Sequence, residues 1–248
     1  MTEKEFLIVI PARYKSTRLP GKPLIDICGK PMIVRTYEQC IAVAGEENVI
    51  VATDDLLVGN ECNNYNINWV MTDESCLTGT DRVCQVASKI KASFYINVQG
   101  DEPLIDPSDI TKMIIEARKD PLNIFCGFAK ITNEDDYFSP NCPKVVMSLD
   151  QKLLYMSRSP IPGNKEGSFR DSFRQICIYS FPRERLLEFS SIGKKSPIEK
   201  VEDIEILRFL EMGLQVRMVL MSGNSIPVDV PEDLAAVKKI ILENGRNE

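Results

Sequence analysis

Short apolar runs alternate with longer segments of helical period along most of this chain, and that order leaves few possible folds. Phe6–Ile10 and Val49–Thr53 are apolar runs of strand length, and Pro31–Ala44 between them has helical spacing. Strand, helix and strand in this order form a β-α-β unit with parallel strands. The further elements that we expect are strands at Trp69–Thr72, Phe94–Val98, Ile124–Ile131, Lys144–Met147, Gln175–Phe181 and Gln215–Leu220, and helices at Thr80–Lys91, Pro107–Arg118, Glu199–Glu211 and Pro231–Leu242.

The predicted fold is therefore α/β, with an open, mostly parallel (mixed) sheet, helices on both faces and a Rossmann-like arrangement. The 248 residues contain no internal repeat or low-complexity linker, so we expect one domain spanning residues 1–248. From Tyr155 to about Phe173 prolines and glycines make the sequence irregular. We expect an excursion from the main sheet over about residues 155–200, which forms either a dimer contact or a lid. Open sheets of this kind bind ligands at the carboxyl ends of their strands.

Several classes of chemistry and partner are excluded by what the chain lacks. It has no histidine, so imidazole catalysis and histidine metal ligation are ruled out. Its eight cysteines form no C-x-x-C pair, which indicates neither a zinc site nor a disulfide framework. The net charge of −6 argues against nucleic acid as a partner. The first apolar run, Phe6–Ile10, is too short for a signal peptide or a membrane span, so we expect a cytoplasmic protein with no membrane partner.

A basic loop, Pro11–Pro23, follows the first strand directly. Its chemistry comes from four cations, two hydroxyls and a glycine, namely Arg13, Lys15, Arg18, Lys22, Ser16, Thr17 and Gly21. Clustered cations and exposed backbone N–H groups suit a triphosphate, whose charge must be neutralised. The spacing is not that of a Walker A loop. The alternative is a solvated basic turn, but the place of the loop after the first strand favours phosphate binding.

Two carboxylates are expected at the same sheet edge as this loop. Asp101 comes just after the strand Phe94–Val98, and Asp229 follows the strand Gln215–Leu220 after a loop. Carboxylate oxygens are ligands that Mg²⁺ prefers, and Mg²⁺ shares them with substrate phosphates. The alternatives are a turn residue for Asp101 and a helix-entry residue for Asp229.

Seven segments of the chain resemble the CMP-Kdo synthetases, the 3-deoxy-manno-octulosonate cytidylyltransferases. They occur in the family's order from residue 6 to about 240, and they are Ile10–Leu24, Gly29–Ile33, Val51–Asp55, Thr78–Arg82, Asn97–Pro103, Ser157–Pro162 and Val228–Leu234. The resemblance implies a nucleotidyltransferase fold and an enzyme that transfers CMP from CTP to the anomeric hydroxyl of 3-deoxy-manno-octulosonate (Kdo) or a close 2-keto sugar acid. Pyrophosphate is the second product. It also implies Mg²⁺ as cofactor, a homodimer, and a place in lipopolysaccharide or capsule biosynthesis.

The resemblance also assigns residues to the reaction. The implied nucleotide-binding residues are Pro11, Ala12, Arg13, Ser16, Thr17, Lys22, Thr78, Gly79 and Asp101. Arg13, Lys22, Asp101 and Asp229 are the implied catalytic residues, with Asp101 and Asp229 as the metal ligands. The sugar hydroxyl would attack the α-phosphorus of CTP while Arg13 and Lys22 offset the charge that develops on the phosphates.

The acceptor pocket is implied to contain Arg82, Gln99, Arg158, Gln175, Tyr179 and Glu202. From the residues alone, Arg82 is interpreted first as a helix-surface residue, an exposed acidic face is the alternative for Glu202, and Tyr179 could equally be a core residue. The chain departs from the family's His-x-Gly-x-Tyr strand by having Gln175 and Cys177, and it has Asp203 where the family often has an apolar residue. Two alternatives follow: an enzyme for a modified acid, such as 8-amino-Kdo or a sialic-type nonulosonate, and a nucleotide-binding protein without turnover.

Overall fold

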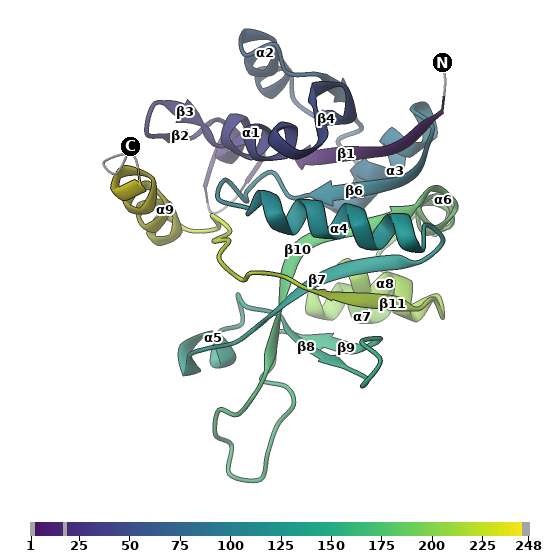
Figure 1. Ribbon diagram of the computed structural model, residues 1–248, viewed down its shortest axis with the longest axis vertical. Coiled ribbons are helices and arrows are strands. Elements are labelled where there is room, and N and C mark those ends of the chain that lie inside the picture. The colour runs from purple at the N-terminus through teal and green to yellow at the C-terminus, as the bar shows by residue number, and fades with distance from the viewer. Residues whose placement is uncertain (1–2, 17–18, 245–248) are drawn as a thin grey trace.

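The computed structural model describes residues 3–16 and 19–244, and its centre is one large sheet (Figure 1). Within these residues nine strands form the sheet, and β2 (Asp26–Ile27) and β3 (Lys30–Pro31) pair separately. The nine are β1 (Lys4–Ala12), β4 (Val49–Thr53), β5 (Trp69–Met71), β6 (Ala92–Val98), β7 (Ile124–Lys130), β8 (Lys144–Met147), β9 (Leu153–Ser157), β10 (Phe173–Pro182) and β11 (Val216–Leu220). The main order is β11-β7-β10-β6-β1-β4-β5, with β8 paired to β10 and β9 paired to β8.

The sheet is mixed, as predicted. β1 runs parallel to β4 and β6, β4 to β5, and β7 to β11. β10 is antiparallel to both of its long neighbours, β6 and β7. The amino-terminal half of β10 therefore lies at the edge where the parallel strands β1, β4 and β6 end. This places Gln175 and Cys177 beside the residues that follow β6, because Ile178 pairs with Val98, the last residue of β6.

Helices cover both faces of the sheet, which confirms the predicted layers (Figure 1). Alternate residues of β1 point to opposite faces, because successive side chains of a strand alternate. Ile8 packs with α1 (Met32–Ala44) and α4 (Pro107–Lys119). Val9 packs with α3 (Gly79–Lys89), α6 (Arg183–Ser191) and α8 (Ile206–Glu211) on the other face. The remaining helices are α2 (Leu56–Asn64), α5 (Glu134–Phe138), α7 (Pro197–Glu202), α9 (Pro231–Asn244) and the short 3₁₀ turns η1 (Lys22–Leu24) and η2 (Glu46–Asn48).

The prediction of one helix over Glu199–Glu211 is wrong. α7 ends at Glu202 and α8 begins at Ile206, because Asp203 has a left-handed backbone with φ 52° and ψ 47°. A left-handed residue ends an α-helix, and Asp is one of the few residues apart from glycine that adopts it readily. The apolar spacing that suggested one helix includes Val201, whose side chain is exposed. The break separates two short helices and turns Glu205 toward α3 and β6.

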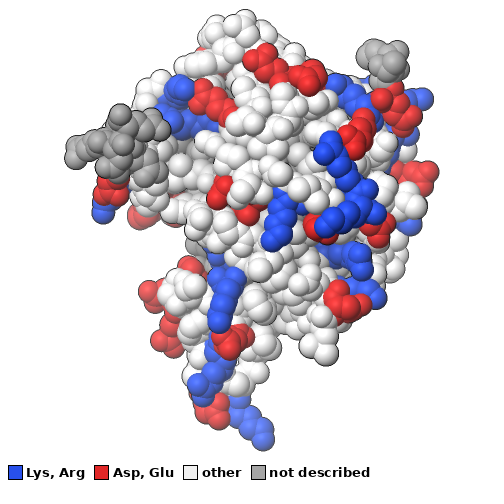
Figure 2. Space-filling view, in the orientation of Figure 1, with Lys and Arg blue, Asp and Glu red and all other residues white. Residues whose placement is uncertain are grey.

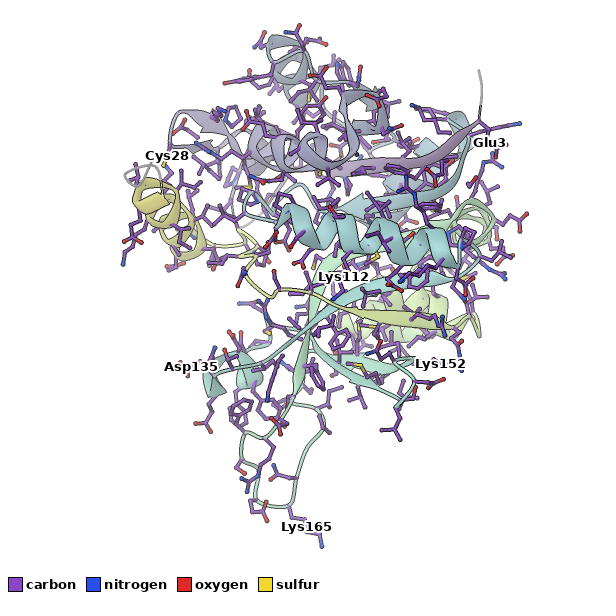
Figure 3. All side chains as sticks on the ribbon, in the orientation of Figure 1. Glu3, Cys28, Lys112, Asp135, Lys152 and Lys165 are labelled. Atoms are coloured by element: carbon purple, nitrogen blue, oxygen red, sulfur yellow. The ribbon has the colours of Figure 1, made fainter. Side chains whose placement is uncertain are left out.

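The irregular segment is shorter than expected. Tyr155 belongs to β9, and regular structure resumes with β10 at Phe173 and continues into α6. Residues 158–172 form the loop that projects from the body of the molecule, with Lys165 at its far tip (Figures 1 and 3). This loop carries side chains of both charges (Figure 2), namely Arg158, Lys165, Glu166, Arg170 and Asp171. Its role as a lid or a dimer contact stays a prediction. In the described residues no helix is long and apolar enough to cross a lipid bilayer.

Candidate active site

The basic loop, Pro11–Pro23, begins where three elements meet at close range. Gly100 follows β6, and a Cβ added to it would lie 2.8 Å from the carbonyl oxygen of Pro11 on β1. Gly79 opens α3, and a Cβ there would lie 3.2 Å from the ring of Pro11 and 2.9 Å from the side-chain amide of Gln99. Real Cβ atoms avoid contacts below about 3 Å, so glycine is required at residue 100, where the contact is with a backbone oxygen, whereas at residue 79 a Cβ would displace the end of the Gln99 side chain. The loop is thereby fixed beside the end of β6 and the start of α3.

A pocket of about 370 Å³ opens over this junction. Of the predicted nucleotide-binding residues, it is lined by Pro11, Ala12, Arg13, Ser16, Lys22, Gly79 and Asp101. Thr78 lines a neighbouring larger pocket and caps α3, since its hydroxyl oxygen accepts from the backbone N–H of Asp81. The amino end of α3 thus lies at the pocket, and helix amino ends favour anions. Thr17 and Arg18 lie outside the described residues.

Lys22 lies between the two carboxylates that were predicted to hold a metal. Its ammonium is 2.5 Å from Oδ2 of Asp101 and 2.9 Å from Oδ1 of Asp229. The segments that carry the two aspartates are joined by a hydrogen bond of 2.9 Å from the N–H of Val228 to the carbonyl of Asp101. Burial disfavours the charged ammonium, but Asp101 and Asp229 outweigh burial, and the pKa of Lys22 is raised.

The ammonium of Lys22 also tests whether the two carboxylates fit a metal ion. One cation already touches an oxygen of each, so the two side chains can hold a single ion together. The described residues contain no group of three or more His, Cys, Asp or Glu side chains that could hold a metal. A Mg²⁺ ion bound here would therefore take its other ligands from water and substrate phosphates, as Mg²⁺ commonly does.

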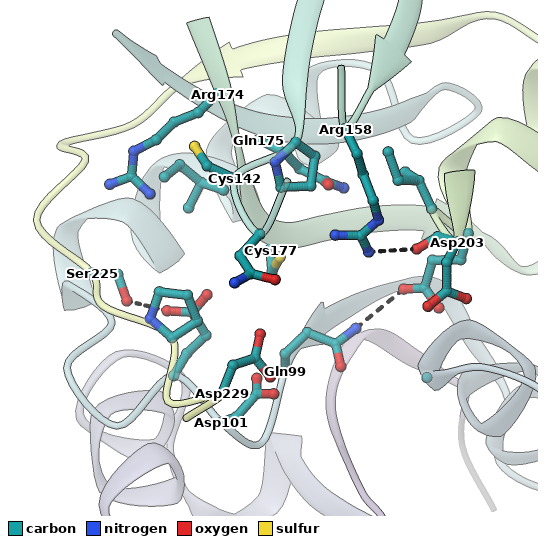
Figure 4. A pocket seen from close by; sticks show the side chains of 18 of the residues that line it. Gln99, Asp101, Cys142, Arg158, Arg174, Gln175, Cys177, Asp203, Ser225 and Asp229 are labelled. Carbon is teal, nitrogen blue, oxygen red and sulfur yellow. Dashed lines mark hydrogen bonds between the residues drawn. The ribbon is translucent and has the colours of Figure 1, made fainter. Parts of the chain in front are cut away.

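The larger pocket, of about 730 Å³, lies directly beside the smaller one. Asp101 and Asp229 lie at its floor near Gln99, with Cys177 facing them from β10 (Figure 4). The residues that line both pockets are Arg13, Gly79, Gln99, Asp101 and Asp229. The two carboxylates thus stand at the boundary between a basic pocket and a roomier one with mixed polarity. Such an arrangement can bring a phosphate donor and a second substrate to one reaction point.

Strand β10 supplies one wall of the larger pocket, including both departures from the family pattern. Gln175 donates from its side-chain amide to the Tyr179 hydroxyl at 2.9 Å, within a buried pair. Burial raises the pKa of Tyr179 well above its usual value, and nearby Cys177 adds to that rise. Burial likewise raises the pKa of Cys177, with Glu102 adding to the effect. A thiol with a raised pKa is a poor nucleophile, so we expect Cys177 to shape the wall of the pocket.

Glu205 is a pocket residue that the sequence did not single out as functional. Its Oε1 accepts from the side-chain amide of Gln99 at 3.1 Å, and its Oε2 accepts from the N–H of Thr80 at 2.9 Å. Enclosure of the carboxyl raises its pKa, although the Thr80 donor opposes the rise. Because Glu205 accepts from the NH₂ of Gln99, the Gln99 carbonyl oxygen is left to accept from another group. In the sequence, the only sign of this contact with Gln99 is that Glu205 is an acidic residue within a segment of apolar helical spacing.

Glu102 lies behind the floor of the larger pocket. It is 2% exposed and accepts a hydrogen bond from the hydroxyl of Ser225. Burial, and then the neighbouring Asp101, raise the pKa of Glu102 to about 8. A protonated Glu102 at neutral pH limits the negative charge beside Asp101.

The six residues predicted for the acceptor are not all in one place. Gln99, Arg158, Gln175 and Tyr179 line the larger pocket. The fully buried guanidinium of Arg82 lines the smaller pocket instead, pairs with Asp54 and donates to the hydroxyl of Thr72 at 2.7 Å. Glu202 is not among the described residues that line either pocket. It accepts from Ser157 at 2.6 Å and from the N–H of Arg158 at 2.8 Å.

Arg158 lines the larger pocket while bracing its edge. Its Nε donates to the carbonyl of Glu202 at 2.6 Å and its Nη2 to the carbonyl of Asp203 at 3.0 Å. Its Nη1 donates to the carbonyl of Pro140 at 2.8 Å. A cation on the last carbonyls of a helix is favourable, so Arg158 stabilises the end of α7. Figure 4 shows the Arg158 side chain beside Asp203.

Comparison with known proteins gives concordant results at the levels of family, sequence and structure. The family model described as "Cytidylyltransferase" matches residues 7–223. The 3-deoxy-manno-octulosonate cytidylyltransferase of Escherichia coli is 37% identical, with 96% of each chain covered. The protein of the same name from Syntrophotalea carbinolica is 41% identical, with 93% of this chain and 96% of that protein covered.

Solved structures extend the comparison to the fold. A CMP:2-keto-3-deoxy-manno-octonic acid synthetase complexed with CTP superposes with a TM-score of 0.89 at 37% identity, covering 97% of this chain and 100% of that one. The 4-diphosphocytidyl-2C-methyl-D-erythritol synthase of Anaerococcus prevotii has a TM-score of 0.65 at 12% identity, over 96% of this chain and 99% of that one. The second likeness shows the fold alone.

Proposed function

The chain belongs to the family of 3-deoxy-manno-octulosonate cytidylyltransferases, and we propose that it transfers CMP from CTP to the anomeric hydroxyl of Kdo or a close 2-keto sugar acid. Pyrophosphate is the other product. The observation that carries the proposal is the pair of adjoining pockets with Asp101 and Asp229 among the residues that line both. A nucleotide in one pocket and a sugar acid in the other would meet at these carboxylates.

In the proposed reaction the smaller pocket takes the triphosphate. Arg13 and Lys22 reach it from the phosphate loop and offset the charge that grows on the phosphates as pyrophosphate leaves. The amino end of α3 adds a favourable dipole. Gly79 and Gly100 keep this wall free of side chains, so the nucleotide can approach the backbone closely.

Nucleotidyltransferases of this family generally use a divalent metal. For this chain we propose Mg²⁺, which Asp101 and Asp229 would hold and which would lower the pKa of the attacking hydroxyl. Asp101 and Asp229 would also fix the position of that hydroxyl at the boundary of the two pockets. Positioning of both reactants is a main part of catalysis in phosphoryl transfer.

The larger pocket is the proposed acceptor site. Gln99 presents its carbonyl oxygen there because Glu205 holds its NH₂ group, so it can accept from a sugar hydroxyl. Tyr179 and Gln175 supply further polar groups on the opposite wall. Kdo is the first expectation for the acceptor. A modified acid is the second, because Gln175 and Cys177 replace the imidazole and glycine of the family pattern.

We also expect a homodimer that contributes to lipopolysaccharide or capsule biosynthesis. Apolar side chains support an interface near the β8–β9 turn and α7, where Leu149, Leu154 and Val201 are exposed. β9 and α7 are neighbours, since the hydroxyl of Tyr155 donates to Glu202 at 3.2 Å. The molar mass in solution, measured by light scattering, tests this expectation, and a monomer would contradict it.

The decisive experiment for the function is pyrophosphate release from CTP with single acceptors. Kdo, 8-amino-Kdo and a sialic-type acid are supplied in turn with Mg²⁺. Pyrophosphate release that requires one of these acceptors supports the proposal, and the ratio of kcat/KM values identifies the preferred acid. Binding of CTP without release for any acceptor would favour a nucleotide-binding protein without turnover.

A further inference from the structure

An ammonium group occupies the place between the two carboxylates that a divalent ion would bridge. Lys22 reaches both Asp101 and Asp229 within hydrogen-bond distance, and only 14% of its side chain is exposed. Asp101 and Asp229 are 29% and 32% exposed, so the three charges are partly shielded from water. In such surroundings charges within contact distance interact far more strongly than at an open surface.

We propose that Lys22 is a placeholder cation, which keeps a divalent ion from the Asp101–Asp229 pair until a nucleotide triphosphate draws its ammonium away. The inference rests on the proposed function, because it takes the two aspartates as the metal ligands. It assigns Lys22 a role before catalysis that is separate from its role toward the phosphates.

Charge opposes the entry of a divalent ion beside Lys22. Two carboxylates carry two negative charges, and Lys22 already neutralises one of them. A divalent ion that entered beside the ammonium would face a cation at contact distance, whereas an ion that replaced it would take over the contacts that Lys22 makes with one oxygen of each carboxylate. Metal binding to the free protein must therefore displace Lys22, and the loss of its two ion pairs opposes binding.

The smaller pocket is where the ammonium of Lys22 can go. Lys22 lines the smaller pocket together with Arg13 and Ser16, and that pocket is the proposed triphosphate site. The Lys22 ammonium at the boundary is therefore close to where phosphate oxygens would lie. A triphosphate offers it new partners of the same charge as the carboxylates it would leave. The nucleotide would thus release the metal ligands as it binds, and metal and nucleotide would strengthen each other's binding.

The carboxylates keep their place when Lys22 leaves. The backbone bond from Val228 to Asp101 joins the two segments independently of Lys22. The N–H groups of Asp229 and Val230 both donate to Asp233, at 2.8 and 3.0 Å, which orders the loop before α9. The segments that carry the two ligands are thus held by a backbone bond and by the side chain of Asp233, without Lys22.

The test measures Mn²⁺ binding to the nucleotide-free protein by electron paramagnetic resonance titration. Lys22→Met removes the ammonium and keeps the aliphatic stem, and we expect it to bind Mn²⁺ at least about tenfold more tightly than the wild type. Lys22→Gln is a second uncharged variant and should show the same gain. Lys15→Met is the matched control, because Lys15 belongs to the same loop, is exposed and pairs with Glu74. Circular dichroism confirms that each variant is folded.

Three results would overturn the proposal. Mn²⁺ affinity of both Lys22 variants equal to that of the wild type would show that the ammonium does not exclude the ion. An equal gain in Lys15→Met would reduce the effect to net charge. A gain that persists in Lys22→Met combined with Asp101→Asn would place the bound ion elsewhere. Pyrophosphate release by the wild type tests the proposed function separately. A negative result in the Mn²⁺ titration can therefore be told apart from a failure of the proposed function.

Discussion

Removal of Arg208 should disturb the framework behind the larger pocket. It lies on α8, fully buried, and donates from Nε and Nη2 to the two carboxylate oxygens of Glu199, each at 2.6 Å. Nη1 also donates to Asp81 at 2.9 Å, near the start of α3. The guanidinium lies 3.8 Å from the ring centre of Phe189. One side chain therefore joins α7, α8 and α3, the helices next to Glu205.

The size of the expected loss follows from burial. In Arg208→Met the carboxylate of Glu199, itself 0% exposed, loses its cation and keeps the bond from the N–H of Ser196. Breaking a buried ion pair from one side costs about 3–5 kcal/mol, because a charge is left without a partner. For a chain of this length each kcal/mol corresponds to roughly 2–4 °C in Tm. The Tm of Arg208→Met should thus fall by about 6–20 °C.

Thermal unfolding followed by circular dichroism measures this loss. The control is Arg217→Met, since Arg217 is half-exposed and 3.8 Å from Asp120, where an ion pair contributes about 0–1 kcal/mol. The double variant Arg208→Met with Glu199→Gln should recover part of the loss, because no buried charge remains at residue 199. If Arg208→Met melts no lower than Arg217→Met, the network does not stabilise the fold and the reasoning from burial fails.

Three further predictions concern the pocket. Asp101→Ala and Asp229→Ala should each lower kcat far more than they lower the affinity for CTP. If both variants keep a kcat within a few-fold of the wild type, the two aspartates are not metal ligands. The double variant Gln175→His with Cys177→Gly should shift the ratio of kcat/KM values toward plain Kdo by roughly ten- to a hundred-fold, while the KM for CTP stays nearly fixed. An equal loss of kcat/KM for all acceptors would refute a role of this strand in selectivity. Glu205→Gln should raise the KM for the acceptor by about ten-fold or more, because the NH₂ group of the introduced glutamine would face an N–H donor where the carboxylate had accepted a hydrogen bond. Because the pKa of Glu205 is raised, its carboxylate loses its charge at a higher pH than an ordinary glutamate does as pH falls. An acid limb of kcat/KM that is unchanged in Glu205→Gln would contradict this assignment.

The pocket proposed for the nucleotide brings together residues that the sequence also groups, because they are local. Lys22 and Arg13 belong to one loop after one strand, so their meeting at the sheet edge follows from the β-α-β order. Asp101 follows β6 directly for the same reason. Asp229 is farther along the chain and is separated from the strand Gln215–Leu220 by a loop, so the strand order alone gave it less support, and the resemblance to a family added to that support.

The acceptor half was less predictable because long-range contacts decide it. Glu205 reaches Gln99 only because α7 and α8 are separated at Asp203, and a left-handed Asp leaves no mark in the apolar spacing. Arg82 read as a surface residue or a ligand of the sugar acid, but its guanidinium is buried against Asp54. Such pairings between residues 28 positions apart cannot be read from helical periodicity.

Because Gly79 and Gly100 lie against Pro11, the two pockets differ in how many substitutions their walls can accept during evolution. On the nucleotide side, even one added methyl group at Gly100 would meet a backbone oxygen, so a lineage has little room for substitution there. The facing wall on β10 is made of side chains such as Gln175 and Cys177, which can be exchanged without moving the backbone of the phosphate loop. A gene for this scaffold could therefore diverge toward new sugar acids while its use of CTP stayed constant.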